Sequence, residues 1–407
     1  MVPFDSLEVR SADERQAALA ASLPGQIAWA KAKATHFAAL LADCDPARVT
    51  SLESLARLPV TRKNALIEMQ RALPPFGGLN ALPLPEMAHI FASPGPIYDP
   101  QGKGADWWRL ARALHAAGFV SGDLIHNAFS YHFTPGGMMF DAAAQALRCP
   151  VFPAGVGNTE QQARALHDLR PAAYVGTPSF LKIILEKAQE LGLDHHSLSK
   201  ACVSGEGLPP SLRQSLADFG VSVRQCYATA DLGLIAYESH ALDGLISDEG
   251  VVVEIVRPGT GDPVPDGEVG EVVVTTLSAD YPLVRFATGD LSTILSGCSP
   301  CGRTNRRIKG WMGRADQTAK VRGMFVHPSQ VADIQKRHPE ILRARLVIER
   351  DQENDRMTLH CELSAALDLV SAVQSSIQAV CKLKGDVVLH PPGSLANDGL
   401  VIADLRN

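Results

Sequence analysis

The segment of residues 281–323 contains the side chains whose types and spacing most directly suggest chemistry. A strand-like run, YPLVRFATGDL, ends with Thr288, Gly289, Asp290 and Leu291. Glycine lets the backbone approach a ligand closely because it has no Cβ, and a carboxylate held beside such a turn can bind the diol of a ribose. The cationic, glycine-containing sequence GRADQTAKVRG follows. The pattern predicts a hinge next to a nucleotide, although Asp290 taken alone could equally cap a turn.

Three other polar turns are predicted to meet at one site. They are residues 177–179, 204–207 and 227–231, and each follows or ends a strand-like run. Strands and helices alternate in this part of the chain, and repeated β-α-β units predict a parallel sheet covered by helices. Ligands of such sheets bind beyond the carboxyl ends of the strands, where all three turns would lie.

The elements that position these turns follow from hydrophobic periodicity and from turn residues. After a helix-rich N-terminal part, we expect helices at 106–119, 142–147, from 160, at 180–191 and at 209–219, and strands at 123–129, 150–155, 172–178, 200–207 and 222–229. An antiparallel meander is expected at 251–256 and 271–277. The tail predicts a helix near residue 327, strands at 344–349, 357–363 and 386–392, and a helix at 369–383.

Length and composition limit the classes of protein that the chain can represent. With 407 residues, 46% of them hydrophobic and 20% charged, it is long enough for two domains. A formal charge of −6 excludes the basic field that DNA or RNA binding requires. No targeting signal and no run of roughly 20 apolar residues is visible. We therefore expect a cytoplasmic protein with no nucleic-acid or membrane partner, whose cysteines are mostly buried thiols.

These motifs, taken in order, resemble those of the adenylate-forming acyl-CoA ligase superfamily and, within it, of the phenylacetate-CoA ligase group. The resemblance extends from about Leu58 to the C-terminus. It implies an α/β fold with a large N-terminal domain, residues 1–311, in which helix-covered, mostly parallel sheets and a small β-meander bind AMP and the acyl group. It also implies a smaller, mobile C-terminal α+β lid domain, residues 312–407.

The resemblance assigns roles around the nucleotide. The sequence SGEG would border the adenine, and in QCYATAD the ring of Tyr227 would stack on it while Asp231 holds Mg²⁺. Ala228 and Ala230 stand at the family's glycine and hydroxyl positions, so Thr229 would contact the α-phosphate. The implied set is Ser204, Gly205, Glu206, Gly207, Tyr227, Ala228, Thr229 and Asp231, with Asp290 and Arg314 for the ribose, Asp316 as the hinge and Gly323 beside the pantetheine arm. The residues alone leave two alternatives open, a core tyrosine with an exposed aspartate and an ordinary turn at 204–207.

The stretch HNAFSYHFTPGGMMF is similar to the family's aromatic motif that leads into the acyl pocket. The residues implied to wall a flat, apolar acid are Tyr131, His132, Phe133 and Gly136, with Tyr174 and Pro178 as further candidates. An aromatic core next to a loop is the competing interpretation.

Cys298 and Cys301 have the spacing of a metal knuckle, since two thiolates on such a turn can both reach one Zn²⁺ at about 2.3 Å. In relatives a Cys and a His complete the site, whereas Ser239 and Ile246 stand there in this chain, with His240 adjacent. The sequence leaves Zn²⁺ open and favours two turn thiols without metal.

Two positions depart from the family pattern. The loop that wraps the ATP phosphates reads ASPGPIYDP at 92–100, where the prolines lack N–H donors and Asp99 would repel a polyphosphate. Leu400 stands where the family has a catalytic Lys that stabilises charge during adenylation, a type of contribution worth about 3 kcal/mol or more.

The resemblance implies an AMP-forming acyl-CoA ligase that uses ATP, Mg²⁺ and CoA on a small aryl or arylacetic acid, through an acyl adenylate and then a CoA thioester. The two departures support an alternative, a catalytically impaired relative that binds AMP, an acyl adenylate or CoA without efficient adenylation. Its partners are small molecules in either case, and the sequence leaves a homodimer open.

Overall fold

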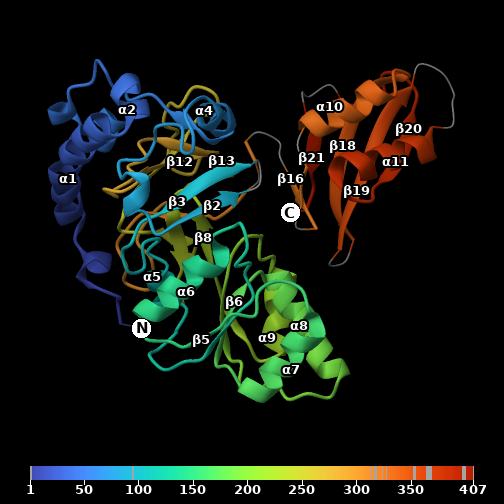
Figure 1. The fold of residues 1–407 in the computed structure, drawn as a ribbon, viewed down its shortest axis with the longest axis horizontal. Coiled ribbons are helices and arrows are strands. Elements are labelled where there is room, and N and C mark those ends of the chain that lie inside the picture. Colours follow the sequence, from blue (N-terminus) through green and yellow to red (C-terminus); the bar gives the residue numbers. More distant parts are fainter. Residues whose placement is uncertain are drawn as a thin grey trace. The chain divides into compact units, whose positions relative to one another are not determined.

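The computed structural model describes residues 2–93, 96–312, 314–315, 319–322, 324–326, 328–351, 354–363, 369–396 and 400–406. The chain divides into two compact units, Met1–Met312 and Gly313–Asn407. Each unit has its own hydrophobic core, and Figure 1 shows the helices and strands of both units.

The first unit is organised around a nine-stranded sheet. One half is parallel and consists, in spatial order, of β5 (Val151–Phe152), β4 (Ile125–Asn127), β6 (Ala173–Gly176), β7 (Lys200–Val203) and β8 (Ser222–Thr229). The other half is antiparallel and continues from β8 through β9 (Gly233–Glu238), β10 (Leu245–Ser247), β15 (Arg307–Ile308) and β14 (Ile294–Leu295). The expected parallel sheet is confirmed, and its antiparallel extension is an addition to the prediction.

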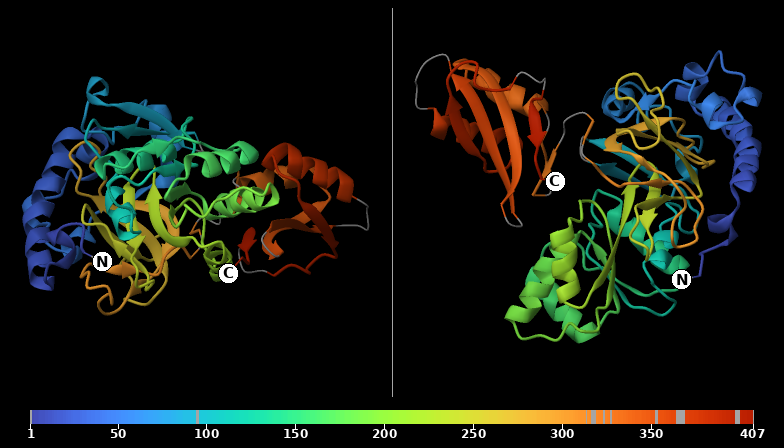
Figure 2. Two further views of the ribbon diagram at one scale, coloured as in Figure 1. Left: turned by 90° about the horizontal axis from the view of Figure 1, so that it is seen from below. Right: turned by 180° about the vertical axis from the view of Figure 1, so that it is seen from behind.

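Helices cover both faces of the parallel half, so successive side chains of one strand enter different cores. Along β6, Val175 belongs to one core and Tyr174 to the other. The core of Tyr174 is formed with α7 (Thr159–Leu169), α8 (Pro178–Glu190) and α9 (Pro210–Asp218), which lie together in Figures 1 and 2. The core of Val175 is formed with α5 (Ala111–Ala116) and α6 (Gly136–Ala146).

The helix predicted at 106–119 is wrong in its first part. Asp106 and Arg109 have φ angles of 47° and 66°, a left-handed conformation that an α-helix cannot contain. The Asp106 carboxylate instead accepts a hydrogen bond of 2.9 Å from the N–H of Ala111, where α5 begins.

A four-stranded sheet contains the expected meander and one further strand. Its order is β1 (Thr61–Arg62), β13 (Phe286–Ser292), β12 (Gly270–Thr276) and β11 (Val251–Val256). The last three strands are antiparallel neighbours, whereas β1 runs parallel to β13. Lys63 directly follows β1. Because β1 and β13 are parallel, Lys63 continues in the direction in which β13 runs toward Asp290.

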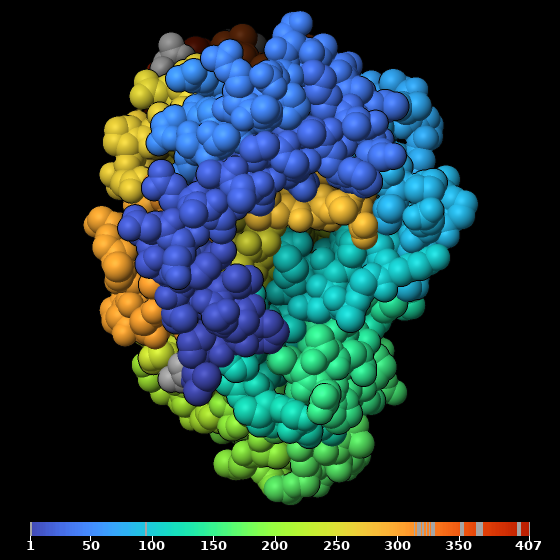
Figure 3. Space-filling view, turned by 90° about the vertical axis from the view of Figure 1, so that its left-hand side faces the viewer, coloured from blue at the N-terminus to red at the C-terminus, as the bar shows by residue number. Residues whose placement is uncertain are grey.

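The N-terminal part forms one long helix, three short helices and a hairpin among its described residues. The helices are α1 (Ala12–Lys33), α2 (Thr35–Leu40), α3 (Leu52–Leu55) and α4 (Leu66–Ala72), with 3₁₀ turns at Ser6–Val9, Pro46–Arg48, Lys63–Ala65 and Leu84–Glu86. Ser11 and Glu14 form a capping box that begins α1. The described residues of the altered phosphate-loop segment lie in the antiparallel hairpin of β2 (His89–Ser93) and β3 (Ile97–Gln101) or directly before β3. Figure 3 shows the N-terminal residues, in blue, spread over one side of this unit.

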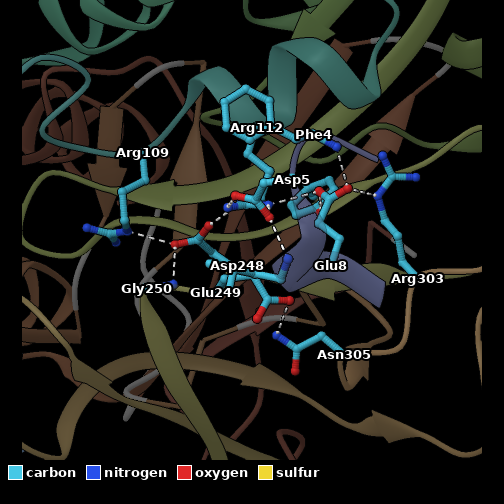
Figure 4. Close-up of polar contacts among 12 residues, drawn as sticks. Phe4, Asp5, Glu8, Arg109, Arg112, Asp248, Glu249, Gly250, Arg303 and Asn305 are labelled. Carbon is cyan, nitrogen blue, oxygen red and sulfur yellow. Dashed lines mark hydrogen bonds and ion pairs between the residues drawn. The ribbon is translucent and has the colours of Figure 1, made fainter. Parts of the chain in front are cut away.

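Buried ion pairs fasten the extreme N-terminus to this unit (Figure 4). The carboxylate of Glu8 accepts hydrogen bonds of 2.9 Å from the N–H of Phe4 and from Nε of Arg303. Arg112 pairs with Asp5 at 2.6 Å and with Glu8 at 3.2 Å. We call Asp5, Glu8, Arg112 and Arg303 the N-terminal clasp.

The second unit is a four-stranded sheet with two helices and a hairpin. Its sheet order is β20 (Asp386–His390), β19 (Asn354–Leu363), β18 (Ile341–Asp351) and β21 (Ile402–Asp404), and the hairpin consists of β16 (Ala319–Val321) and β17 (Met324–Val326). The helices α10 (Pro328–Arg337) and α11 (Val370–Cys381) share one core with the sheet. The predicted α/β fold class is therefore confirmed.

No helix among the described residues is both long and apolar enough to cross a membrane.

Candidate functional site

The nine-stranded and the four-stranded sheet of the first unit are joined where Tyr227 of β8 contacts Asp290 of β13. The Tyr227 hydroxyl donates a hydrogen bond of 2.7 Å to Oδ2 of Asp290, and the indole N–H of Trp311 donates one of 3.1 Å to Oδ1. Asp290 is only 8% exposed. Because the two donors orient both carboxylate oxygens, Asp290 holds its carboxylate in a fixed direction, as the binding of a diol requires.

A buried ion pair lies next to this contact. The ammonium of Lys63 donates a short hydrogen bond to Oδ2 of Asp231, whose side chain is fully buried. Burial alone would lower the pKa of Lys63, but the negative charges of Asp231, Asp99 and Asp290 raise it above its ordinary value. Lys63 is therefore held as a cation, paired with Asp231 and stabilised by the charges of two further carboxyl groups.

The hairpin of β2 and β3 contributes a second buried carboxyl group. Ser93 donates a short hydrogen bond to Oδ2 of Asp99, which is 1% exposed. Burial, followed by the charge of the neighbouring Asp231, raises the pKa of Asp99 well above its ordinary value. Oδ1 of Asp231 has no hydrogen-bond partner among the described residues, so this atom fits the role of an oxygen ligand to Mg²⁺.

The predicted strand-end turns are brought together along β6, β7 and β8. The N–H of Ser179, at the start of α8, donates a hydrogen bond of 2.7 Å to Glu206, which lies in the turn after β7. Ser204 in turn donates one of 2.9 Å to the carbonyl of Cys226 on β8. Gly205 has a φ of 84°, a conformation that favours glycine.

The last residues of β8 face the antiparallel strand that follows. Ala228 pairs with Leu234, and Thr229 pairs with Gly233. The hydroxyl of Thr229 accepts a hydrogen bond of 3.2 Å from the N–H of Leu232. Thr229 thus has a structural contact within its own turn, and its proposed contact to the α-phosphate stays a prediction.

The candidate acyl-pocket residues occupy different environments. The side chain of Phe133 is 83% exposed, and Gly136 begins α6. The hydroxyl of Tyr131 accepts a hydrogen bond of 2.8 Å from Asn127 and donates one of 3.3 Å to Asp141. His132 is also exposed, whereas Tyr174 and Pro178 are buried.

Tyr174 belongs to the core between the sheet and helices α7 to α9, where it is fully buried. Its hydroxyl donates a hydrogen bond of 3.2 Å to the carbonyl of Thr177. Tyr174 therefore stabilises the turn after β6 from within the core. The exposed aromatic ring is that of Phe133, in the loop before α6.

The candidate zinc knuckle is not a cluster of metal ligands. Burial alone would raise the pKa of the Cys301 thiol, but hydrogen bonds from Ser239, Ser299 and Arg303 lower it. Cys298 is exposed. No group of three or more His, Cys, Asp or Glu side chains in the described part of the chain could hold a metal ion. Zn²⁺ binding by Cys298, Cys301 and His240 thus finds no support.

The remaining predicted residues belong to the second unit. Arg314 is described there, and Leu400 lies just before β21 with its side chain 41% exposed. Asp316 and Gly323 lie outside the described residues.

Sequence reasoning missed Lys63 and Trp311 and treated Asp99 only as a source of repulsion. Lys63 follows a strand of two residues that shows no periodicity. Trp311 follows the glycine of RIKGWMG, and a tryptophan within the predicted nucleotide motif was the available signal. The signal for Asp99 was an acidic residue directly after the apolar pair Ile97 and Tyr98.

Comparison with known proteins relates the chain to ligases. The model of the AMP-binding enzyme family matches residues 109–278. A phenylacetate-coenzyme A ligase of Thermus thermophilus is 32% identical over 339 residues, which cover 79% of this chain and 75% of the relative. A phenylacetate-coenzyme A ligase of Escherichia coli K12 is 30% identical over 348 residues, covering 81% and 78% of the two chains.

Solved structures give the same relation. A crystal structure of 2-hydroxyisobutyryl-CoA ligase, in complex with 2-HIB-AMP and CoA, superposes with a TM-score of 0.83 and 27% identity, covering 100% of this chain and 94% of that chain. An amide bond synthetase, McbA from Marinactinospora thermotolerans, shares the fold with a TM-score of 0.57 and 16% identity, covering 78% of this chain and 68% of that chain.

Proposed function

The chain belongs to the family of AMP-binding enzymes that contains the phenylacetate-coenzyme A ligases, and we propose that it is an AMP-forming acyl-CoA ligase. In the first step a carboxylate oxygen attacks the α-phosphorus of ATP, and an acyl adenylate and pyrophosphate form. In the second step the thiol of CoA attacks the acyl carbon, loses its proton and displaces AMP. ATP and CoA are consumed, and the products are pyrophosphate, AMP and the thioester.

Asp290 carries most of this proposal, because its carboxylate is buried, oriented by two donors and placed at the junction of both sheets. We assign it to the ribose hydroxyls, and we assign the ring of Tyr227 to one face of the adenine. Glu206 and its neighbours would border the adenine from the turn after β7. Arg314 would complete the ribose site, with Asp316 as the hinge of the second unit.

Lys63 supplies positive charge that the altered motifs lack. Its ammonium lies beside Asp231, and the charges of Asp231, Asp99 and Asp290 all act on it. Preorganised charge next to a reacting phosphate stabilises the transition state because it needs no reorganisation. We assign Lys63 to the neutralisation of the phosphate-binding region, and Asp231 to Mg²⁺, which would screen the phosphate charge when bound.

The acid is proposed to be small and aromatic, such as an aryl or arylacetic acid. This proposal rests on the aromatic loop before α6, in which Phe133 is exposed and Phe129 stacks on Phe140 with ring centroids 4.8 Å apart. The backbone carbonyl of Phe133 accepts a hydrogen bond of 2.8 Å from Ala92, which ties this loop to the hairpin of Asp99. An acyl site between them would lie beside the nucleotide.

The alternative function is binding of AMP, an acyl adenylate or CoA without efficient adenylation. Two observations favour it. Leu400 offers no charge at the family's lysine position, and the paired strands β2 and β3 contain few hydroxyl groups.

AMP release from ATP, Mg²⁺ and CoA, measured across arylacetic, benzoic and short aliphatic acids, distinguishes the two functions. Wild type is compared with Leu400→Lys and Asp290→Ala. Acid-dependent AMP from wild type, lost in Asp290→Ala, supports the ligase. Activity in Leu400→Lys alone supports the impaired relative. Silence in wild type and Leu400→Lys contradicts the ligase, and calorimetric AMP binding that Asp290→Ala abolishes would then support the binding protein.

A further inference from the structure

Three buried oxygen atoms around Lys63 have no hydrogen-bond partner among the described residues. They are Oδ1 of Asp99, Oδ1 of Asp231 and the hydroxyl of Tyr281. Tyr281 is 2% exposed, and the charges of Asp231 and Asp99 both act on its hydroxyl. Buried polar atoms in proteins almost always have a partner, and an exception points to a water or ion that completes the site.

The other oxygen of each carboxyl group is already engaged. Oδ2 of Asp231 accepts from Lys63, and Oδ2 of Asp99 accepts from Ser93. The two carboxyl groups lie within hydrogen-bonding reach of one another. Without a metal, a proton on Asp99 joins the two carboxyl groups by a hydrogen bond. A divalent cation that replaced this proton would meet two carboxyl groups, each with one oxygen already engaged.

The charges of the cluster point to a cation. Lys63 carries one positive charge, whereas Asp231 and Asp99 are two acidic groups whose side chains are almost completely buried. Burying an unpaired carboxylate is costly unless a cation or a proton compensates it. In the protein without metal a proton on Asp99 compensates the second charge, in agreement with its raised pKa, and a divalent cation bound with the nucleotide would take the place of that proton.

We propose that Asp99 is a second protein ligand, beside Asp231, for the divalent cation that accompanies the nucleotide. This inference rests on the proposed function for the identity of the nucleotide. Mg²⁺ is typically bound by one or two carboxylates together with substrate phosphates, not by a complete protein cage. A pair of aspartates fits that pattern without a third protein ligand.

The hairpin explains how the altered phosphate loop acquires this role. Asp99 pairs with Phe91 across the hairpin, and Ser93 pairs with Ile97. The hydrogen bond from Ser93 fixes the Asp99 carboxyl group with its free oxygen beside Asp231. A loop poor in N–H donors would then bind phosphate through a cation held by its own aspartate.

The test is Mn²⁺ binding, measured by electron paramagnetic resonance with and without ATP, for wild type, Asp99→Asn and Asp231→Asn. Asparagine preserves the shape of the side chain but is a poorer ligand. We expect both variants to bind Mn²⁺ in the presence of ATP about tenfold more weakly or worse, since changes at or near a metal site typically cost 10- to 100-fold. Asp106→Asn is the matched control, because Asp106 also has a buried Oδ1 without a partner among the described residues. Its affinity for Mn²⁺ should equal that of wild type.

Thermal unfolding without metal provides a second readout, because the amide that Asp99→Asn introduces can donate a hydrogen bond to Asp231. We expect Asp99→Asn to have a higher melting temperature than wild type without Mn²⁺ and to lose the stabilisation by Mn²⁺. Wild type that binds no Mn²⁺ under either condition, or Asp99→Asn that binds it within twofold of wild type, would overturn the proposal. Mn²⁺ binding that depends on Asp99 in a protein that forms no AMP would leave the metal site standing and reject the ligase.

Discussion

Tyr227 and Asp290 belong to different sheets and are joined by a hydrogen bond of 2.7 Å from the tyrosine hydroxyl to the carboxylate. The contact combines an aromatic face with an oriented acid, the two groups that a nucleoside needs for its base and its ribose. We expect Tyr227→Phe to weaken AMP binding about tenfold. The variant keeps the aromatic ring and loses the hydrogen bond that orients Asp290, and a hydrogen bond to a charged group is worth roughly 1.5–3 kcal/mol. Isothermal titration calorimetry measures the change.

Tyr237→Phe is the control for this prediction, since Tyr237 also donates to a buried carboxylate, that of Glu8, at 2.5 Å. This variant should lose stability and keep its AMP affinity. Equal AMP affinities in wild type and Tyr227→Phe would reject the role of the hydroxyl, and Tyr227→Ala would then test the ring alone.

The pair of Lys63 and Asp231 should make a large and non-additive contribution to stability. Lys63→Met leaves a fully buried carboxylate without its cation, and breaking a buried pair in this way costs about 3 kcal/mol or more. Lys63→Met combined with Asp231→Asn should cost clearly less than the sum of the single changes, because no unpaired charge remains. Urea unfolding of the four proteins of this cycle gives the coupling free energy, and strict additivity would contradict the pairing.

The sequence predicted the parts of the site that lie close together in the chain. The turns at 177–179, 204–207 and 227–231 could be placed at strand ends because periodicity identifies β6, β7 and β8, and neighbouring parallel strands end at the same edge. Their hydrogen bonds agree with this placement. The roles of these residues in binding stay predictions.

Lys63 and Asp99 could not be predicted from local patterns. Lys63 reaches Asp231 because β1 pairs with β13, far along the chain, and the two residues of β1 show no alternation. Asp99 is buried on a hairpin strand next to the buried Pro100, a packing that the local sequence does not predict. Propensity describes single segments, and both contacts depend on pairs of segments.

The stability of the protein should depend on pH through Asp106. Burial is the largest cause that raises the pKa of Asp106, from 3.8 to about 7. The native state therefore binds more protons than the unfolded state between about pH 4 and pH 7, so the stability from this group falls as the pH rises through that window and is lost above pH 7. Asp106→Asn cannot ionise at this position. Its free energy of unfolding relative to that of wild type should therefore increase by on the order of 2 kcal/mol from pH 5 to pH 8.

Denaturant unfolding of wild type and Asp106→Asn at both pH values measures this difference, and other titrating groups cancel between the two proteins. The amide oxygen of asparagine can still accept the hydrogen bond from Ala111. A difference between the two proteins that does not change with pH would show that Asp106 has an ordinary pKa.

The N-terminal clasp should be a major source of stability for the first unit. Glu8 is 1% exposed and contacts Phe4, Tyr237, Arg303 and Arg112. Glu8→Ala leaves Arg303, itself 1% exposed, without its counter-ion, and we expect a loss of about 3–5 kcal/mol in the free energy of unfolding. Asp13→Ala removes an exposed acid from the same segment and should change stability by less than about 1 kcal/mol. Similar losses in both variants would mean that net charge, and not the buried contacts, fastens the N-terminus.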